Sequence, residues 1–294
     1  KDDKVMINDV MRFLDNVLTD FIERAPEQFD DAKYSAEKER SVGLGVMGFH
    51  SYLQQHSIPL ESVMSKAWNK KIFKHIQEHV DQASKDLADE RGPCPDAADY
   101  GYNERFSNKT AIAPTASISI ICGGASPGVE PVAANSYTHK TLSGSFNVRN
   151  RYLVELLEKH GKNTDDVWSE ITTNQGSVSH LDFLTDLEKD VFKTAFELDQ
   201  KWIIELSGDR TPYISQAQSI NLFVPADIHK RELHKIHFDA WKKGLKSLYY
   251  CRSKSIQRAE NVNDTKATDV TANVYKSKPQ TTEQPEYEEC LSCQ

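Results

Sequence analysis

The stretch "AIAPTASISIICGGASPGVEP", residues 111–131, decides how the chain is interpreted, because an apolar run leads directly into Pro114 and a series of small hydroxyl residues. The run predicts a β-strand over Ala111–Ile121, followed by a turn at "GGASPG". Small hydroxyl side chains and unobstructed backbone N–H groups can surround phosphate oxygens, which makes the stretch a candidate anion-binding loop. A plain strand whose hydroxyls face solvent explains the same pattern, and spacing alone leaves both interpretations open.

Helices and strands alternate on both sides of this stretch. Apolar residues at intervals of three and four predict helices over residues 4–24, 68–87, 182–206 and 228–243. Short apolar runs predict strands at 41–46, 219–224 and 245–251. This interleaving is typical of α/β proteins.

Size and charge exclude several classes of protein. The chain has 294 residues, a formal charge of -8 and 38% hydrophobic residues, as expected for one large or two modest globular domains. Its 36 Lys and Arg against 44 Asp and Glu argue against a general nucleic-acid binder. The sequence shows no apolar run long enough to span a membrane and no signal peptide, so we expect a cytoplasmic protein without a membrane partner. Because it begins with Lys1, we expect the later part of a longer protein.

The segment "GLGVMG" at 43–48 matches the G-x-G-x-x-G dinucleotide fingerprint letter for letter. The context of that fingerprint is missing, because charged residues precede it and the candidate acid, Glu61, follows Pro59 in a polar loop. We interpret these glycines as positions where a strand and a helix approach closely.

The polar segment 261–289 predicts a flexible tail, which ends in "ECLSCQ". Cys290 and Cys293 form a C-x-x-C pair that suits a mobile redox dithiol, half of a zinc site or two inert thiols. The adjacent Tyr249 and Tyr250 also allow two interpretations. Paired aromatic residues in a strand usually pack on its two faces, whereas neighbouring phenols can also pass a hydrogen atom or an electron.

Three stretches in this order carry a resemblance to one family: "PTASIS" at 114–119, "SLYYCRSKSIQRAE" at 247–260, and the terminal cysteine pair on a polar tail. Together they resemble the carboxy-terminal part of the large (alpha) subunit of class I ribonucleoside-diphosphate reductase, with bacteriophage-type members the most similar. "RSVGLGVMGFHSYL" at 40–53, "SPGVEP" at 126–131 and "VFKTAFELDQ" at 191–200 are similar to further segments of that family. The resemblance extends over essentially the whole chain.

The resemblance implies both a fold and an activity. The fold would be the second half of a ten-stranded α/β barrel, with residues 1–260 as the C-terminal half of the catalytic barrel domain and 261–294 as a disordered redox tail. The activity would be the reduction of ribonucleoside diphosphates to deoxyribonucleoside diphosphates by thiyl-radical chemistry.

The resemblance also assigns roles to individual residues. The diphosphate of the substrate would be held by Pro114, Thr115, Ala116, Ser117 and Ile118. Tyr249 and Tyr250 would relay a radical from the small subunit, with Tyr249 nearer the catalytic thiol. Cys290 and Cys293 would re-reduce an active-site disulfide and would themselves be reduced by thioredoxin or glutaredoxin.

The expected cofactors and partners follow from the same resemblance. This chain would bind no metal or cofactor itself. A di-iron tyrosyl radical would reside in the partner small (beta) subunit, and nucleotide effectors would bind elsewhere. The partners would be the N-terminal half of the large subunit, the small subunit and the dithiol protein, and the assembled large subunit would be a homo-oligomer.

Two features depart from the family pattern. The terminal cysteines are closer together than is usual there, and the finger-loop cysteine, its Asn and Glu companions and the two active-site disulfide cysteines have no match. Cys94 and Cys122 stand in other contexts, "GPCPD" and "IICGG". We therefore expect half a catalyst, which needs a partner chain with the finger-loop cysteine. The alternative is a non-catalytic nucleotide- or phosphate-binding module with a zinc- or thiol-based interaction tail.

Overall fold

Four extended segments form a row in the part of the chain that the computed structural model describes, residues 2–141 and 144–254. In chain order they are residues 41–46, 108–113, 216–225 and 249–254, and each runs parallel to the next. Strand β3 (Leu222–Pro225) pairs with strand β4 (Cys251–Lys254) at the end of the row. The row confirms a mixed α/β fold with parallel neighbours, each reached through a helical crossover.

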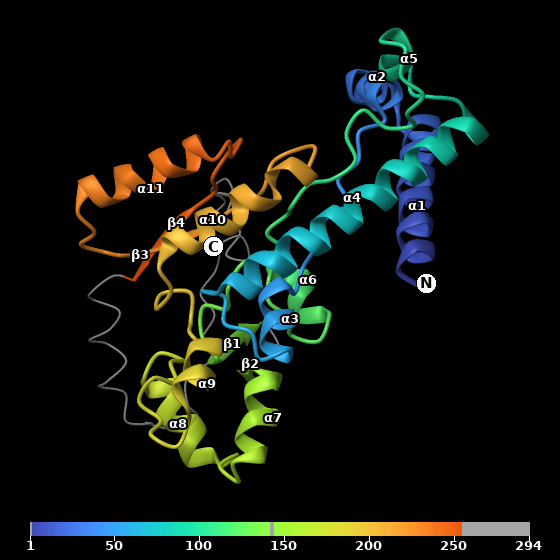
Figure 1. Cartoon of the computed structure of the whole chain (residues 1–294). Helices are drawn as coiled ribbons and strands as arrows, with labels where there is room; N and C mark the ends of the chain where they lie inside the picture. Colours follow the sequence, from blue (N-terminus) through green and yellow to red (C-terminus); the bar gives the residue numbers. More distant parts are fainter. Residues whose placement is uncertain (1, 142–143, 255–294) are drawn as a thin grey trace, which may run out of the picture.

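Helices α1 and α4 shape one side of this row. They belong to a first helical group, which comprises α1 (Asp2–Arg24), the 3-10 helix η1 (Glu27–Phe29), α2 (Asp30–Glu39), α3 (Phe49–Gln55), α4 (Val63–Arg91) and α5 (Pro95–Asp99). The C-terminal half of α4 packs on α1 and its N-terminal half packs on α10 (Gln200–Arg210), so α4 crosses the molecule as a long brace (Figure 1). Helix α4 begins where the Ser62 hydroxyl accepts the Ser65 N–H and ends at Gly92, whose φ is 85°.

A second unit is inserted between the second and third extended segments. It comprises the antiparallel hairpin of β1 (Ser136–Thr141) and β2 (Gly144–Arg149), followed by α7 (Arg151–Lys159), α8 (Asp165–Thr173) and α9 (Asp186–Val191). The fully buried Trp168 lies in a separate hydrophobic core with Leu153, Leu157 and Ile171. The Asn135 amide stabilises this unit by donating to the carbonyls of Gly176 and Phe192, at 3.0 and 2.7 Å, which joins the residue before β1 to the ends of α8 and α9.

The helix predicted over 182–206 is wrong as a single element. The structure has α9 and α10 instead, separated by eight non-helical residues. Tertiary hydrogen bonds take the backbone groups that a continuous helix would use: the Ala195 N–H donates to Val132, and the Asp199 N–H donates to the Glu61 carboxylate at 2.7 Å. The Asp199 side chain then caps α10 by accepting the Lys201 N–H.

The strand predicted over 111–121 is also wrong beyond residue 113. Thr115 has a left-handed backbone, and a short helix α6 (Ala116–Ile121) follows it. The strand predicted at 245–251 begins later, because pairing starts when the Tyr249 N–H donates to Ile220 at 2.8 Å. The helices predicted at 4–24, 68–87 and 228–243 are confirmed as α1, α4 and α11 (Lys230–Lys242), and the 3-10 helix η2 (Thr211–Tyr213) follows α10.

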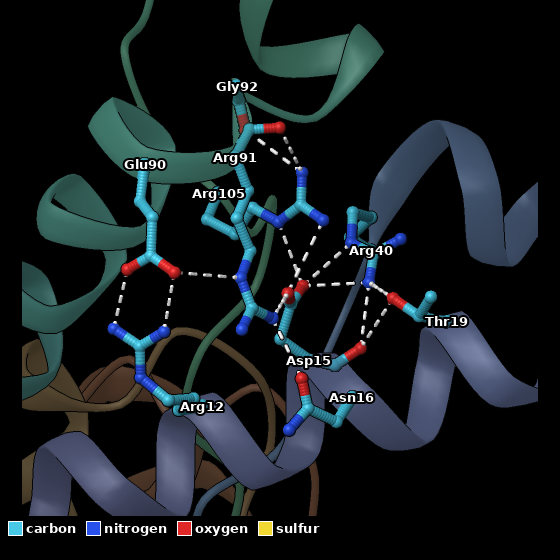
Figure 2. A network of polar contacts seen from close by, with 9 residues as sticks. All are labelled: Arg12, Asp15, Asn16, Thr19, Arg40, Glu90, Arg91, Gly92 and Arg105. Atoms are coloured by element: carbon cyan, nitrogen blue, oxygen red, sulfur yellow. Dashed lines mark hydrogen bonds and ion pairs between the residues drawn. The ribbon is translucent and has the colours of Figure 1, made fainter.

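One buried carboxylate links α1 to the end of α4. Figure 2 shows Asp15 of α1 surrounded by the guanidinium groups of Arg40, Arg91 and Arg105, which donate to it at 2.7–2.8 Å. Burial alone would raise the pKa of Asp15, but hydrogen bonds from Arg105 and Arg91 and the charge of Arg40 outweigh it and lower the pKa. The cluster therefore links α1, α4 and the two loops that lead into the first and second extended segments.

The opposite face of α1 is apolar and exposed. Val5, Met6 and Phe13 are each at least 60% exposed, and with Asp9 and Val10 they line a shallow depression of about 490 Å³. None of the helices in the described part of the chain combines the length and the hydrophobicity of a membrane-spanning segment.

Candidate functional site

The loop predicted to bind phosphate leaves the second extended segment and turns sharply at Thr115. Its φ of 52° lies in the left-handed region, which a β-branched residue rarely adopts. The Thr115 hydroxyl accepts the Gly128 N–H at 2.7 Å, which holds this turn. A left-handed residue followed by a helical turn makes successive backbone N–H groups converge, as in an anion-binding nest. The N–H groups of the first turn of α6 also have no acceptor within their own helix.

The "SPGVEP" segment packs between this loop and the start of α3. Ser51 and Ser126 exchange backbone-to-hydroxyl hydrogen bonds at 2.8 and 3.1 Å, and the Gly48 N–H donates to the Ser126 carbonyl. A Cβ on Gly128 would lie 2.9 Å from the Ala113 carbonyl oxygen, so a side chain there would displace the segment.

The fully buried His50 fixes the same junction. Its Nδ1 accepts the Val132 N–H at 3.1 Å. Burial lowers the pKa of His50 to about 4, so the ring is a neutral acceptor near pH 7.

The glycines of "GLGVMG" allow two extended segments to approach each other, rather than a strand and a helix. A Cβ on Gly45 would lie 2.5 Å from the Ala111 carbonyl oxygen, and a Cβ on Gly43 would lie 3.0 Å from the Ala111 side chain. Gly48 has a φ of 79° and precedes α3. The close approach that we expected is confirmed, but its partner is the neighbouring segment.

A buried carboxylate connects the "SPGVEP" segment to β3. Glu130 is 6% exposed, and its Oε1 accepts the Asn221 N–H at 3.2 Å. Burial raises the pKa of Glu130, while hydrogen bonds from Asn221 and the charge of Arg252 act in the opposite direction. Neither Glu130 of "SPGVEP" nor Asn221 was among the candidate site residues predicted from the sequence. An acidic residue within an apolar, proline-flanked segment was the available signal.

The two tyrosines lie at the start of β4 with their rings in contact. The ring centroids are 4.1 Å apart and the planes are inclined by 51°. Tyr249 is 45% exposed and Tyr250 is 46% exposed, so neither ring is enclosed within the chain. The Tyr250 N–H donates to the Asn221 Oδ1 at 3.1 Å, and its carbonyl accepts the Leu222 N–H at 2.9 Å.

The structure thus connects the phosphate-loop candidates to the tyrosine pair through a short bonded series. Thr115 binds Gly128, Glu130 two residues later binds Asn221, and Asn221 binds Tyr250. Cys290 and Cys293 lie outside the described residues. Within the ranges that the structure describes, no group of three His, Cys, Asp or Glu side chains is arranged to hold a metal ion.

Comparison with known proteins decides the family. The profile described as "Ribonucleotide reductase, barrel domain" matches residues 2–104 and 96–251. The chain belongs to the ribonucleotide reductase barrel-domain family. The resemblance inferred from the three sequence stretches is therefore confirmed, and so is the α/β barrel-type fold.

Relatives of this ribonucleotide reductase barrel chain agree with the profile. The ribonucleoside-diphosphate reductase large subunit of Invertebrate iridescent virus 6 is 50% identical over 267 residues, which are 90% of this chain and 28% of the relative. A putative large subunit from Frog virus 3 is 37% identical over 98% of this chain and 48% of the relative. The Actinobacillus ureae class Id ribonucleotide reductase alpha subunit has a TM-score of 0.79 and 38% identity, covering 86% of this chain and 47% of that one.

The chain therefore spans between about a quarter and a half of the length of these large subunits. The roles expected for Tyr249, Tyr250, Cys290, Cys293 and residues 114–118 stay predictions, as does the bacteriophage-type subgroup.

Proposed function

We propose that this chain supplies part of the catalytic barrel of a ribonucleoside-diphosphate reductase large subunit, which reduces ribonucleoside diphosphates to deoxyribonucleoside diphosphates. The observation that carries the proposal is the ring contact between Tyr249 and Tyr250, both of which are about half exposed. Hydrogen bonds through Asn221 and Glu130 connect this pair to the segment that is bonded to Thr115. The names of its relatives support the reaction class.

The tyrosine pair acts as a relay for an unpaired electron. Tyr250 loses the hydrogen atom of its O–H to an oxidant radical on a partner subunit, and Tyr250 then takes the hydrogen atom of the Tyr249 O–H. Tyr249 recovers a hydrogen atom from a cysteine S–H, which leaves a thiyl radical on that sulfur. Each transfer breaks one X–H bond and forms another, so neighbouring phenols 4.1 Å apart between ring centroids suit short transfers.

The loop of Pro114, Thr115, Ala116, Ser117 and Ile118 receives the diphosphate of the substrate. The left-handed Thr115 and the first turn of α6 supply backbone N–H groups, which can donate to phosphate oxygens. Ser117 is exposed beside them and adds a hydroxyl donor.

The cysteine that becomes a thiyl radical comes from another polypeptide segment, the part of a large subunit that this chain does not span. The exposed apolar face of α1, centred on Met6 and Phe13, and the exposed Ile118 and Ile121 of α6 are the surfaces that this part covers. The assembled large subunit is a homo-oligomer in this proposal.

The remaining partners supply the oxidant and the reductant. A small subunit with a di-iron tyrosyl radical delivers the radical to Tyr250. Cys290 and Cys293 exchange with the active-site disulfide, and thioredoxin or glutaredoxin reduces them in turn. Residues 261–294 are thus a redox arm appended to a barrel domain, residues 1–260.

Reconstitution tests the proposal. This chain is mixed with the remaining part of a large subunit, a radical-bearing small subunit, thioredoxin and a ribonucleoside diphosphate, and deoxynucleotide formation is measured by chromatography. We expect product only when every component is present. Product at background level, together with about one zinc per chain that is lost in Cys290→Ser, would favour the non-catalytic binding module instead.

Association with the missing part is tested separately by light scattering. Residues 1–260 alone are expected to aggregate or to bind that part tightly, and Phe13→Glu should weaken the binding. Tyr100→Glu is the matched control, because Tyr100 is also exposed but follows α5 and does not line the depression on α1. A monodisperse monomer that does not bind the missing part would contradict the assignment of these surfaces.

A further inference from the structure

Glu130 is a buried carboxylate whose role none of the sequence patterns explains. Its backbone turns away after Pro127, since the Glu130 N–H donates to the Pro127 carbonyl at 3.0 Å. Its Oε1 accepts the backbone N–H of Asn221, the residue that precedes β3. A carboxylate this deeply buried is costly unless it is hydrogen-bonded or paired with a cation.

Arg252 is the cation whose charge acts on Glu130, and it belongs to β4. Its guanidinium carbon lies 5.9 Å from the centroid of the Tyr250 ring. Arg252 therefore stands in the field of the Glu130 carboxylate and over the phenol ring at the same time.

Asn221 provides a second connection between the same two residues. Its backbone N–H serves the Glu130 carboxylate, and its side-chain Oδ1 accepts the Tyr250 N–H at 3.1 Å. Glu130 is thus connected to Tyr250 through the hydrogen bonds of Asn221, and Arg252 lies close to both residues.

We propose that Glu130 is a positioning residue for Tyr250: its ionised carboxylate orients Asn221 and Arg252, and protonation of Glu130 changes the surroundings of the Tyr250 ring. The meaning of this coupling for catalysis rests on the proposed relay, because Tyr250 is the residue that would receive the radical. The coupling itself is a property of this chain.

The pKa of Glu130 is raised above the usual value of a glutamate carboxyl. Burial raises the pKa of Glu130, and the Asn221 hydrogen bonds and the Arg252 charge only partly offset it. Among the described residues, His50 is a further titratable group near this segment; its Nδ1 accepts the Val132 N–H and its pKa is about 4, so it stays neutral through most of the pH range of the test.

The test uses the whole 294-residue chain bound to the remaining part of a large subunit, with 3-fluorotyrosine at position 250, and follows its ¹⁹F resonance from about pH 4 to 7, below the range in which tyrosine phenols ionise. We expect the resonance to titrate with a midpoint above that of an exposed glutamate. Glu130→Gln keeps an oxygen for the Asn221 N–H but has no charge to lose, so the titration should disappear. A fluorotyrosine at the exposed position 100 should not respond to that substitution.

Arg252→Gln is a second variant, and it removes the charge of a partly exposed residue. Because the Arg252 charge lowers the pKa of Glu130, its loss should move the midpoint at position 250 upward. An unchanged titration in Glu130→Gln, or an unchanged midpoint in Arg252→Gln, would overturn the proposal. The spectra require no turnover, so failure of the coupling and failure of the relay are distinguishable results.

Discussion

Replacing Asp15 by Asn tests whether the buried cluster of Figure 2 holds α1 against the end of α4. The Asp15 side chain is fully buried and accepts from Arg40, Arg91 and Arg105 at 2.7–2.8 Å. Asn keeps the shape but removes the charge, and it turns an N–H₂ group toward at least one guanidinium. The three arginines then have no carboxylate to donate to at this position.

The size of the effect follows from the burial of the cluster. Removing one partner from a buried ion pair costs about 3–5 kcal/mol, because the remaining charge is left without compensation. If opening of α1 governs exchange, that loss speeds hydrogen exchange of its amides by roughly a hundredfold to several thousandfold. The pKa of Asp15 is lowered in the folded state, so its stabilisation is present above the unfolded-state value of about 3.9 and is lost as pH falls through the folded pKa.

Hydrogen–deuterium exchange read by mass spectrometry measures this effect for α1 and for the last turns of α4. Asp20→Asn on the same helix is the matched control, because Asp20 forms an exposed pair with Arg24 that is worth at most about 1 kcal/mol. If the exchange rate of the α1 amides rises no more in Asp15→Asn than in Asp20→Asn, the stabilising role of the Asp15 cluster is refuted.

Three further predictions concern the site and the tail. Because burial lowers the pKa of His50 to about 4, the unfolded chain binds a proton on this residue more readily than the folded chain does, and about 3 kcal/mol of stability is lost between pH 7 and 4. His50→Asn keeps a hydrogen-bond acceptor but does not titrate, so the free energy of urea unfolding should depend less on pH in this variant. An unchanged pH dependence of the unfolding free energy would contradict the assignment to His50. Gly128 has a φ of 47° and faces the Ala113 carbonyl, so Gly128→Ala should break the hydrogen bond to Thr115. Diphosphate binding should then weaken about tenfold in calorimetry of the assembled enzyme. Wild-type affinity in this variant would contradict the role of the loop in diphosphate binding. Cys290→Ser should permit about one round of reduction with thioredoxin and then stall, and continued cycling would remove the role of the tail.

The helical elements were predictable where one apolar face decides the structure, and α4 and α11 show this. Helix α1 was predicted correctly, but its apolar residues serve two faces, since Met11 is buried and Val17 is about half exposed. Asp15, four residues after Met11, was a visible polar residue on the buried side. Its partners could not be predicted, because they lie 25, 76 and 90 residues away along the chain.

The candidate site shows a similar division. The β-branched residues after Pro114 favoured a strand, but the tertiary hydrogen bond from Gly128 to Thr115 accompanies a left-handed turn and a helix instead. The tyrosine pair was recognisable because both members are adjacent in sequence. Glu130 was not recognised, since its importance depends on Asn221, 91 residues further along the chain.

The central claim is that Tyr249 and Tyr250 conduct an unpaired electron toward a sulfur atom on another polypeptide segment. The most direct measurement is turnover of the reconstituted reductase with Tyr249→Phe or Tyr250→Phe, with folding checked by circular dichroism. Phe preserves the ring packing at 4.1 Å but has no O–H to lose, so each variant should fold normally and form no deoxynucleotide above background. Normal turnover in either variant would contradict the account.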